Sequence, residues 1–378
     1  MKSDGKTLSR YGFLLFRAIS AVFLLIPEIL YLIIKNDPEA CTFFTDRITG
    51  PFKRAMASFF SFLPISMAEI LIILIFSAAA ALPVFLIVTI IRRRSGWKMR
   101  IIKVITLVLL VVLFGWSMMD MMWGVNYYSY SFSERSGISS DGCSVDDLSS
   151  VTLYFALQLN NISGKVPRDD TGLFIADTDI IAELAPEQID LLCDRYPFLS
   201  GKDIAPRAAI LSVVMSFLST SGYTFPYTGE CMLNVHQPDA FIPFTAFHEL
   251  SHQRNVASEE EANFTAALAC LESNHDEFRY SGLLHSFISL SNSLYSVAPE
   301  LTNGIYDILE HDVLSDIRAN NSYWKRFENN ISEKTDEMYD GFLKEYDQPL
   351  GIKSYGAVTD LLVTYYKEDA KAFFNEYS

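Results

Sequence analysis

The chain has 378 residues, half of them apolar, and a formal net charge of −15. Its length accommodates two domains, and its apolar fraction is high for a soluble protein. The acidic balance argues against nucleic acid and against anionic lipid as partners, because both carry negative charge.

Three long apolar stretches lie in the first third of the chain. They cover residues 12–34, 66–91 and 101–119. Each is long enough to cross about 30 Å of hydrocarbon as a helix, and none has the short apolar run and small-residue site of a cleaved signal peptide. We therefore predict three transmembrane helices, which make residues 1–119 a membrane anchor in contact with a lipid bilayer.

Basic residues are distributed unevenly around these stretches. The N-terminal head and the connection after the second stretch are rich in Lys and Arg, whereas residues 35–63 mix both signs of charge. By the positive-inside rule the two basic segments are cytoplasmic. Of the 45 acidic residues 39 follow residue 119, against 16 of the 30 basic ones. We expect a multi-pass protein of the cell membrane, with a cytoplasmic N-terminus and an extracytoplasmic C-terminal domain.

Beyond the last apolar stretch, residues 120–142 are predicted to leave the membrane and to form a linker. Residues 143–378 are predicted to be a mainly helical domain with a small β element. The five cysteines show no C-x-x-C spacing, and the four in this domain permit a disulfide. Residues 208–218 fit either a strand or a helix, and residues 231–235 fit a strand. Helices are predicted over residues 144–159, 178–196 with a break at Pro186, 243–253, 258–271, 279–294, 302–320, 323–347 and 357–377.

Residues 248–252 read His-Glu-Leu-Ser-His, an H-E-x-x-H motif. On a helix, His248 and His252 lie on one face, where both imidazoles can bind one Zn²⁺. Glu249 is placed to act as general base toward a zinc-activated water. The alternative is a surface helix with solvated histidines, and apolar neighbours such as Phe247 argue against it because they place the helix in a core.

An acidic segment at residues 258–263 supplies candidates for a third zinc ligand. Ser258 and Glu261 fit a capping box, which would occupy Glu261. Because helical positions i and i+4 share a face, Glu259 aligns with Asn263, and we predict Glu259 as the ligand with Asn263 orienting it. The rivals that stay open are Glu260, Glu261 and Glu272.

The two segments resemble the H-E-x-x-H plus E-x-x-A-[ND] pattern of gluzincin metallopeptidases. The chain is similar to membrane proteases of the CAAX prenyl protease and heat-shock HtpX type, and to the ImmA/IrrE metallopeptidases. It resembles more closely a family of bacterial three-span membrane proteins with a domain of unknown function, through P-Y-T-G-E at residues 226–230 and S-Y-G at residues 354–356. The resemblance implies a zincin-like (gluzincin) fold with zinc bound by His248, His252 and Glu259.

Two further residues are candidates for the site. Glu230 can approach the metal from the strand at residues 231–235, and a loop-stabilising role is equally open. Tyr355 is a candidate donor to the oxyanion of a tetrahedral intermediate, with packing as the alternative. The strand at residues 231–235 is expected to border the cleft and to pair with an extended peptide. Surface or packing roles are predicted for His275, His285 and His311.

These features predict a membrane-anchored zinc metallopeptidase acting on a peptide or protein substrate. Zinc would activate the attacking water and Glu249 would be the general base. The alternative is a non-catalytic zinc-binding or peptide-binding sensor domain of the cell envelope. The presence of Glu249 favours the enzyme, because a purely structural zinc site needs no base.

Overall fold

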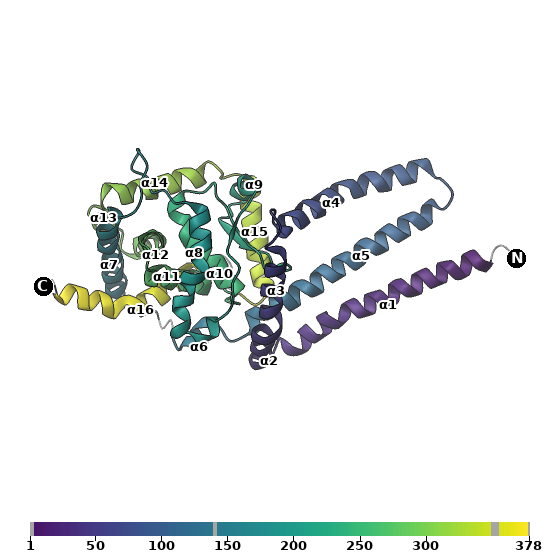
Figure 1. Ribbon diagram of the computed structural model, residues 1–378, viewed down its shortest axis with the longest axis horizontal. Helices are drawn as coiled ribbons and strands as arrows, with labels where there is room; N and C mark the ends of the chain where they lie inside the picture. Colours follow the sequence, from purple (N-terminus) through teal and green to yellow (C-terminus); the bar gives the residue numbers. More distant parts are fainter. Residues whose placement is uncertain (1–3, 139–141, 349–354, 377–378) are drawn as a thin grey trace.

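The computed structural model describes residues 4–138, 142–348 and 355–376, which form helices and one small sheet. Three long helices extend from one side of a helical domain (Figure 1). They are α1 (Asp4–Ile34), α4 (Met67–Arg92) and α5 (Trp97–Met122). The predicted fold class, mainly helical with three long apolar helices and a small β element, is confirmed.

The three long helices are apolar enough to cross a membrane, over Leu15–Ile34, Met67–Arg92 and Trp97–Tyr128. Most of their large apolar side chains are exposed, and so extended an apolar surface is unfavourable in water. They therefore suggest a membrane protein. The start of α1 and the connection between α4 and α5 lie at the end farthest from the domain (Figure 1). Both predicted basic segments thus lie at the same end of the extension.

Residues 35–63, predicted only as a connection, fold into helices that run across the base of the extension (Figure 1). These are α2 (Pro38–Phe44), the π-helical turn η1 (Thr45–Thr49) and α3 (Gly50–Phe60). Asp37 caps α2 by accepting the N–H groups of Glu39 and Ala40, both at 3.1 Å. A capped start followed by Pro38 in the first turn favours a helix here.

The predicted linker is also structured. It contains the 3₁₀ helix η2 (Gly124–Tyr128) and α6 (Phe132–Ser136). Trp123, Val125 and Phe132 are buried, so this segment packs against the rest of the molecule. Aromatic residues of the predicted linker therefore belong partly to a protein core.

The domain core surrounds α12 (Asp276–Val297), which packs against α7, α10, α11 and α16. Fully buried rings such as Phe155, Phe247 and Phe278 fill it, and burial of each contributes roughly 1.5–3 kcal/mol. The other helices are α7 (Val145–Ser163), α8 (Thr178–Asp190), α9 (Ser212–Phe217), α10 (Ile242–Gln253), α11 (Glu259–Glu272), α13 (Pro299–Tyr306), α14 (His311–Lys325), α15 (Asn330–Glu345) and α16 (Tyr355–Glu376), with 3₁₀ turns at Leu191–Asp194, Pro197–Leu199 and Asp239–Phe241.

Three helix predictions were wrong in detail, among them that over residues 323–347, because residues 323–325 belong to α14 and α15 begins only at Asn330. α8 continues through Pro186, because Ile181, Ala185 and Ile189 form one buried face on both sides of the proline. The helix predicted over residues 302–320 is two helices, α13 and α14. All five cysteines are free in the structure.

The sheet has three short strands in the order β1-β3-β2. They are β1 (Arg207–Ala208), β2 (Gly222–Thr224) and β3 (Cys231–Leu233), with β3 parallel to β1 and antiparallel to β2. The strand predicted at residues 231–235 is therefore present, but it lies at the centre of the sheet. Since both of its edges are already paired, its predicted pairing with a peptide is wrong.

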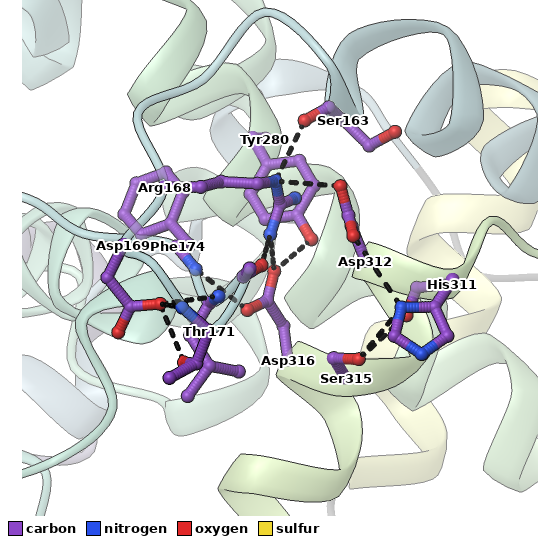
Figure 2. A network of polar contacts seen from close by, with 12 residues as sticks. Ser163, Arg168, Asp169, Thr171, Phe174, Tyr280, His311, Asp312, Ser315 and Asp316 are labelled. Carbon is purple, nitrogen blue, oxygen red and sulfur yellow. Dashed lines mark hydrogen bonds and ion pairs between the residues drawn. The ribbon is translucent and has the colours of Figure 1, made fainter.

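A buried polar network joins the loop after α7 to α12 and α14 (Figure 2). Asp316 is its centre: Oδ1 accepts the N–H of Phe174 at 3.0 Å, and Oδ2 accepts Arg168 Nη1 at 3.0 Å and the hydroxyl of Tyr280. Arg168 also donates to the carbonyl oxygen of Ser163 at 3.1 Å. Both carboxylate oxygens of Asp316 thus have protein donors, and the network is complete on that side without a ligand.

Candidate metal centre

The H-E-x-x-H motif lies on α10, as predicted. Pro243 occupies the first turn, where its missing N–H costs no hydrogen bond, and Phe244 and Phe247 are buried on the core side. The helix places His248 and His252 one turn apart, with their Nε2 atoms separated by 3.1 Å. The two imidazoles therefore face the same small volume.

Glu259 joins them from the first turn of α11. The turn between the helices is short because Asn255 adopts a left-handed conformation, with φ of 69°, which Asn tolerates better than most residues. Glu259 Oε2 lies 3.3 Å from His248 Nε2, and Oε1 lies 3.5 Å from His252 Nε2. Ligand atoms of a tetrahedral site with bonds of about 2.0–2.1 Å lie about 3.3 Å apart, so these separations are close to those of such a site.

The second ring nitrogens show which atoms are free to bind a metal. His252 Nδ1 lies 2.7 Å from the carbonyl oxygen of Val256, and His248 Nδ1 lies 2.9 Å from Asn263 Oδ1. Both partners only accept, so each Nδ1 carries the proton and each Nε2 presents a lone pair. Two lone pairs and the Glu259 carboxylate then face one another, which is repulsive unless a cation or a proton lies between them. The donor set therefore fits a metal ion.

Asn263 differs from its prediction. We expected it to orient Glu259, but its oxygen holds the ring of His248 instead. The cause is the short turn, which brings the first turns of α11 against the C-terminal half of α10. The residue still supports the group, through a histidine rather than through the carboxylate.

Two of the rival carboxylates are engaged elsewhere. The oxygens of Glu261 accept the N–H groups of Phe132 and Ser133 at 2.7 and 2.9 Å, at the start of α6. Glu272 pairs with Arg195 at 2.8 Å, at the opposite end of α11. Among the residues that the structure describes, the group that comes together at metal-ligand spacing is His248, His252 and Glu259.

Glu249 lines the same cavity as the three candidate ligands and is only 3% exposed. Its Oε2 accepts a hydrogen bond from the Thr224 hydroxyl at 2.8 Å, and a Cβ added to Gly222 would come within 2.7 Å of its Oε1. Burial raises the pKa of Glu249 to about 7; His248 and the Thr224 hydrogen bond oppose this rise, while Glu259 adds to it. A carboxyl with such a pKa can both take and release a proton near neutral pH.

Three contacts were missed because they come from distant segments. The hydroxyl of Tyr339, on α15, contacts Glu259 Oε1. The ring of Trp123 lies against that of His252, with centroids 5.3 Å apart. The third is the Thr224 contact described above. No local sequence spacing predicts any of these three contacts. The only sequence signal near two of them was the aromatic character of residues 123–128 and 223–227.

The group opens into a cavity of about 490 Å³. His248, Glu249 and His252 line it together with strand β2, helix α15 and the end of α5. His285 also borders it, stacked on Phe244 with ring centroids 3.7 Å apart, and burial lowers its pKa to about 3. The space is large enough for several side chains of a peptide.

The two remaining candidates are Glu230 and Tyr355. Glu230 lies away from the candidate metal ligands, and the side chain of Tyr355 is not among the described parts of the structure. Glu230 accepts the N–H groups of Met67 at 3.1 Å and Ala68 at 2.8 Å, so it caps the N-terminus of α4 and does not reach the metal ligands. The helix start attracts the carboxylate because its N–H groups are unpaired and carry partial positive charge. Tyr355 begins α16, and its side chain lies outside the described part of the chain.

Comparison with known proteins places the chain in a family. A comparison with curated proteins finds no match, and neither does a comparison with solved structures. A family model described as "Protein of unknown function (DUF3810)" matches residues 45–363, a range that includes α4, α5 and all three candidate metal ligands. The chain therefore belongs to the DUF3810 family.

Proposed function

We propose that the protein is a membrane-anchored zinc metallopeptidase of the gluzincin type. His248, His252 and Glu259 would hold the metal, and Glu249 would be the general base. The observation that carries the proposal is the convergence of two imidazole nitrogens, 3.1 Å apart, with the Glu259 carboxylate, whose two oxygens lie 3.3 and 3.5 Å from them. The buried carboxyl of Glu249 lies on the same helix as the two histidines.

Zinc suits this set of donors. Two imidazole nitrogens and one carboxylate oxygen would supply the three protein ligands that are typical of catalytic zinc sites. When bound, zinc would supply Lewis acidity toward a peptide carbonyl and would lower the pKa of water. Asn263 and Val256 would orient the two imidazoles by holding their Nδ1–H groups.

Glu249 would move the proton. The hydroxyl of Thr224 occupies Oε2, which leaves Oε1 as the oxygen that accepts a proton from water. Because burial raises its pKa to about 7, the same carboxyl can pass the proton to the leaving amine at neutral pH. Gly222 matters here, since any larger residue would crowd Oε1.

A peptide would bind along β2, which replaces β3 as the proposed recognition strand. Hydrogen bonds from Asn234 N to Ser221 O and from Phe225 N to Glu230 O, both 2.9 Å, set the register with β3. In that register the backbone groups of Gly222 and Thr224 point to the outer edge of the sheet. Both residues line the cavity, so an extended peptide can add to this edge beside the metal.

The anchor and domain would be arranged as the charge pattern indicates. We propose residues 1–119 as the anchor and residues 143–378 as an extracytoplasmic catalytic domain, with residues 120–142 joining them. The basic connection between α4 and α5 lies opposite the domain, which supports placing the domain outside the cytoplasm (Figure 1).

The alternative is a zinc-binding sensor domain of the envelope without catalysis. Zinc analysis and cleavage of casein and a peptide library, with the full chain in detergent, distinguish the two. We expect about one zinc per wild-type chain and cleavage, full zinc with at least ~100-fold slower cleavage for Glu249→Gln, and loss of zinc for His252→Ala. Wild-type protein with full zinc and no cleavage would support the sensor, and wild-type protein that binds no zinc would overturn both.

A further inference from the structure

Helix α9 turns an apolar face outward. Val213, Val214 and Phe217 on α9, together with Ile210 in the turn before it, follow the spacing i, i+3, i+4, i+7 and are 46–68% exposed. Such spacing places them on one side of a helix. Residues 208–229 contain no charged side chain, although the chain after residue 119 carries a net charge of −23. An uncharged, outward apolar face is thus set in an otherwise strongly acidic domain.

The opposite side of α9 packs against the domain. Met215 and Ser216 are buried, and the hydroxyls of Ser216 and Tyr323 lie 2.5 Å apart. At the C-terminal end of the outward face, the ring of Phe217 meets that of Phe327 edge-on, with centroids 5.0 Å apart. The apolar face therefore has a fixed direction.

α9 lies where the second candidate span begins (Figure 1). The N–H of Leu211 donates to Glu69 Oε1, in the first turn of α4, at 2.8 Å. Arg207, just before α9, donates to the carbonyl oxygen of Leu63 at 2.6 Å. These hydrogen bonds hold α9 beside the N-terminal end of α4, where the second candidate span begins.

Exposed aromatic residues also lie in the segment that leads into α4. Phe59 and Phe62 precede the helix, are 61% and 70% exposed, and contact each other edge-on with ring centroids 5.8 Å apart. Soluble surfaces rarely carry contiguous apolar areas of this kind. This surface lies beside the candidate spans. The bilayer that α4 would cross is therefore the nearest apolar environment that could bury it.

We propose that the apolar face of α9, together with Phe59 and Phe62, is a membrane-contact surface that dips into the acyl boundary of the leaflet where α4 begins. The partner is the uncharged, apolar part of the bilayer, since α9 has no basic residue that would select anionic headgroups. Leu218 and Ser219, directly after α9, line the cavity of the metal centre, so this contact holds the cavity at the membrane surface. The contact itself does not depend on the proposed enzymatic activity.

Spin labels on the full chain in phosphatidylcholine vesicles test the proposal. The labels are placed by Val213→Cys on the proposed surface, Val112→Cys within the third candidate span and Leu301→Cys on α13, in a background where the two half-buried cysteines, Cys143 and Cys193, are serine. Leu301 is the matched control, because it is apolar and 50% exposed, against 46% for Val213, but lies on the side of the domain away from the spans (Figure 1).

The readout is the relaxation of each label by oxygen, which concentrates in lipid, and by a water-soluble nickel chelate. We expect the Val213 label to respond more to oxygen, as the Val112 label does, and the Leu301 label to respond more to nickel. A Val213 label that behaves like the Leu301 label would overturn the proposal, and so would protection from both reagents, which indicates a protein cover. If Val213→Cys does not fold, Val214→Cys on the same face gives the same readout.

Discussion

The Asp316 network and the metal centre are both buried polar clusters, but they differ in their balance of donors and acceptors. Each oxygen of Asp316 receives a hydrogen bond from the protein (Figure 2). In the metal centre, His248 Nε2, His252 Nε2 and Glu259 Oε2 face one another, while the ring protons point away. Both oxygens at the centre of the first cluster are thus paired by protein donors, whereas the acceptors of the second need a cation between them.

The largest effect is expected from breaking the Asp316 network. Asp316→Ala removes the closer and more deeply buried of the two carboxylates that pair with Arg168, leaves Asp312 at 3.5 Å, and should lower the free energy of unfolding by about 3–5 kcal/mol. Denaturant unfolding with and without zinc measures this. Because the network takes no ligand, the same loss is expected in both conditions, and a loss that zinc reverses would contradict the distinction between the clusters.

A slightly smaller effect is expected from pH on the metal-free protein. Since burial raises the pKa of Glu249 from 4.5 to about 7, protonated Glu249 stabilises the fold below about pH 4.5, and this contribution disappears as the pH rises through 7. The difference is on the order of 3 kcal/mol. From pH 4.5 to 8, the free energy of unfolding of wild type should therefore fall more than that of Glu249→Gln, by about this amount. Parallel curves would mean that Glu249 has an ordinary pKa.

Zinc should stabilise the protein through the metal centre. At about 100 times its dissociation constant, zinc should raise the free energy of unfolding of wild type by about 2.7 kcal/mol. His252→Ala removes one of the three converging atoms and should abolish the rise in melting temperature on zinc addition. Arg168→Lys, in the other cluster, is the control that should keep the rise.

The smallest effect is expected from removing one hydroxyl in each cluster. Tyr280→Phe removes a donor to buried Asp316 and should lower the free energy of unfolding by about 1.5–3 kcal/mol, with or without zinc. Tyr339→Phe removes the donor to Glu259 from a side chain that is 40% exposed, so we expect about 1 kcal/mol or less. This smaller loss should change when zinc is added, because zinc binds the same carboxylate. An equal loss with and without zinc would place Glu259 outside the metal site.

The features that sequence could predict are those encoded within one element or across one short turn. Hydropathy is local, so the three apolar helices were predictable. The spacing of His248 and His252 implies one helix face, and Glu259 follows after so short a turn that its helix must lie beside the first. The sequence contained this grouping because few backbone degrees of freedom separate its members.

The parts that could not be predicted depend on contacts between distant segments. Tyr339 reaches Glu259 across 80 residues, and no pattern near either residue indicates the pair. Glu230 follows a turn and precedes a strand near the metal motif, yet its partner is the start of α4. The order of the strands also follows from topology, which is why the central strand β3 was mistaken for the strand that borders the cleft.

The most direct test of the metal centre is anomalous scattering at the zinc edge from crystals of the full chain grown with zinc. We expect one peak within about 2.0–2.2 Å of His248 Nε2, His252 Nε2 and a Glu259 oxygen. No peak at these atoms, or a peak bound by Glu260 or Glu272 instead, would contradict it.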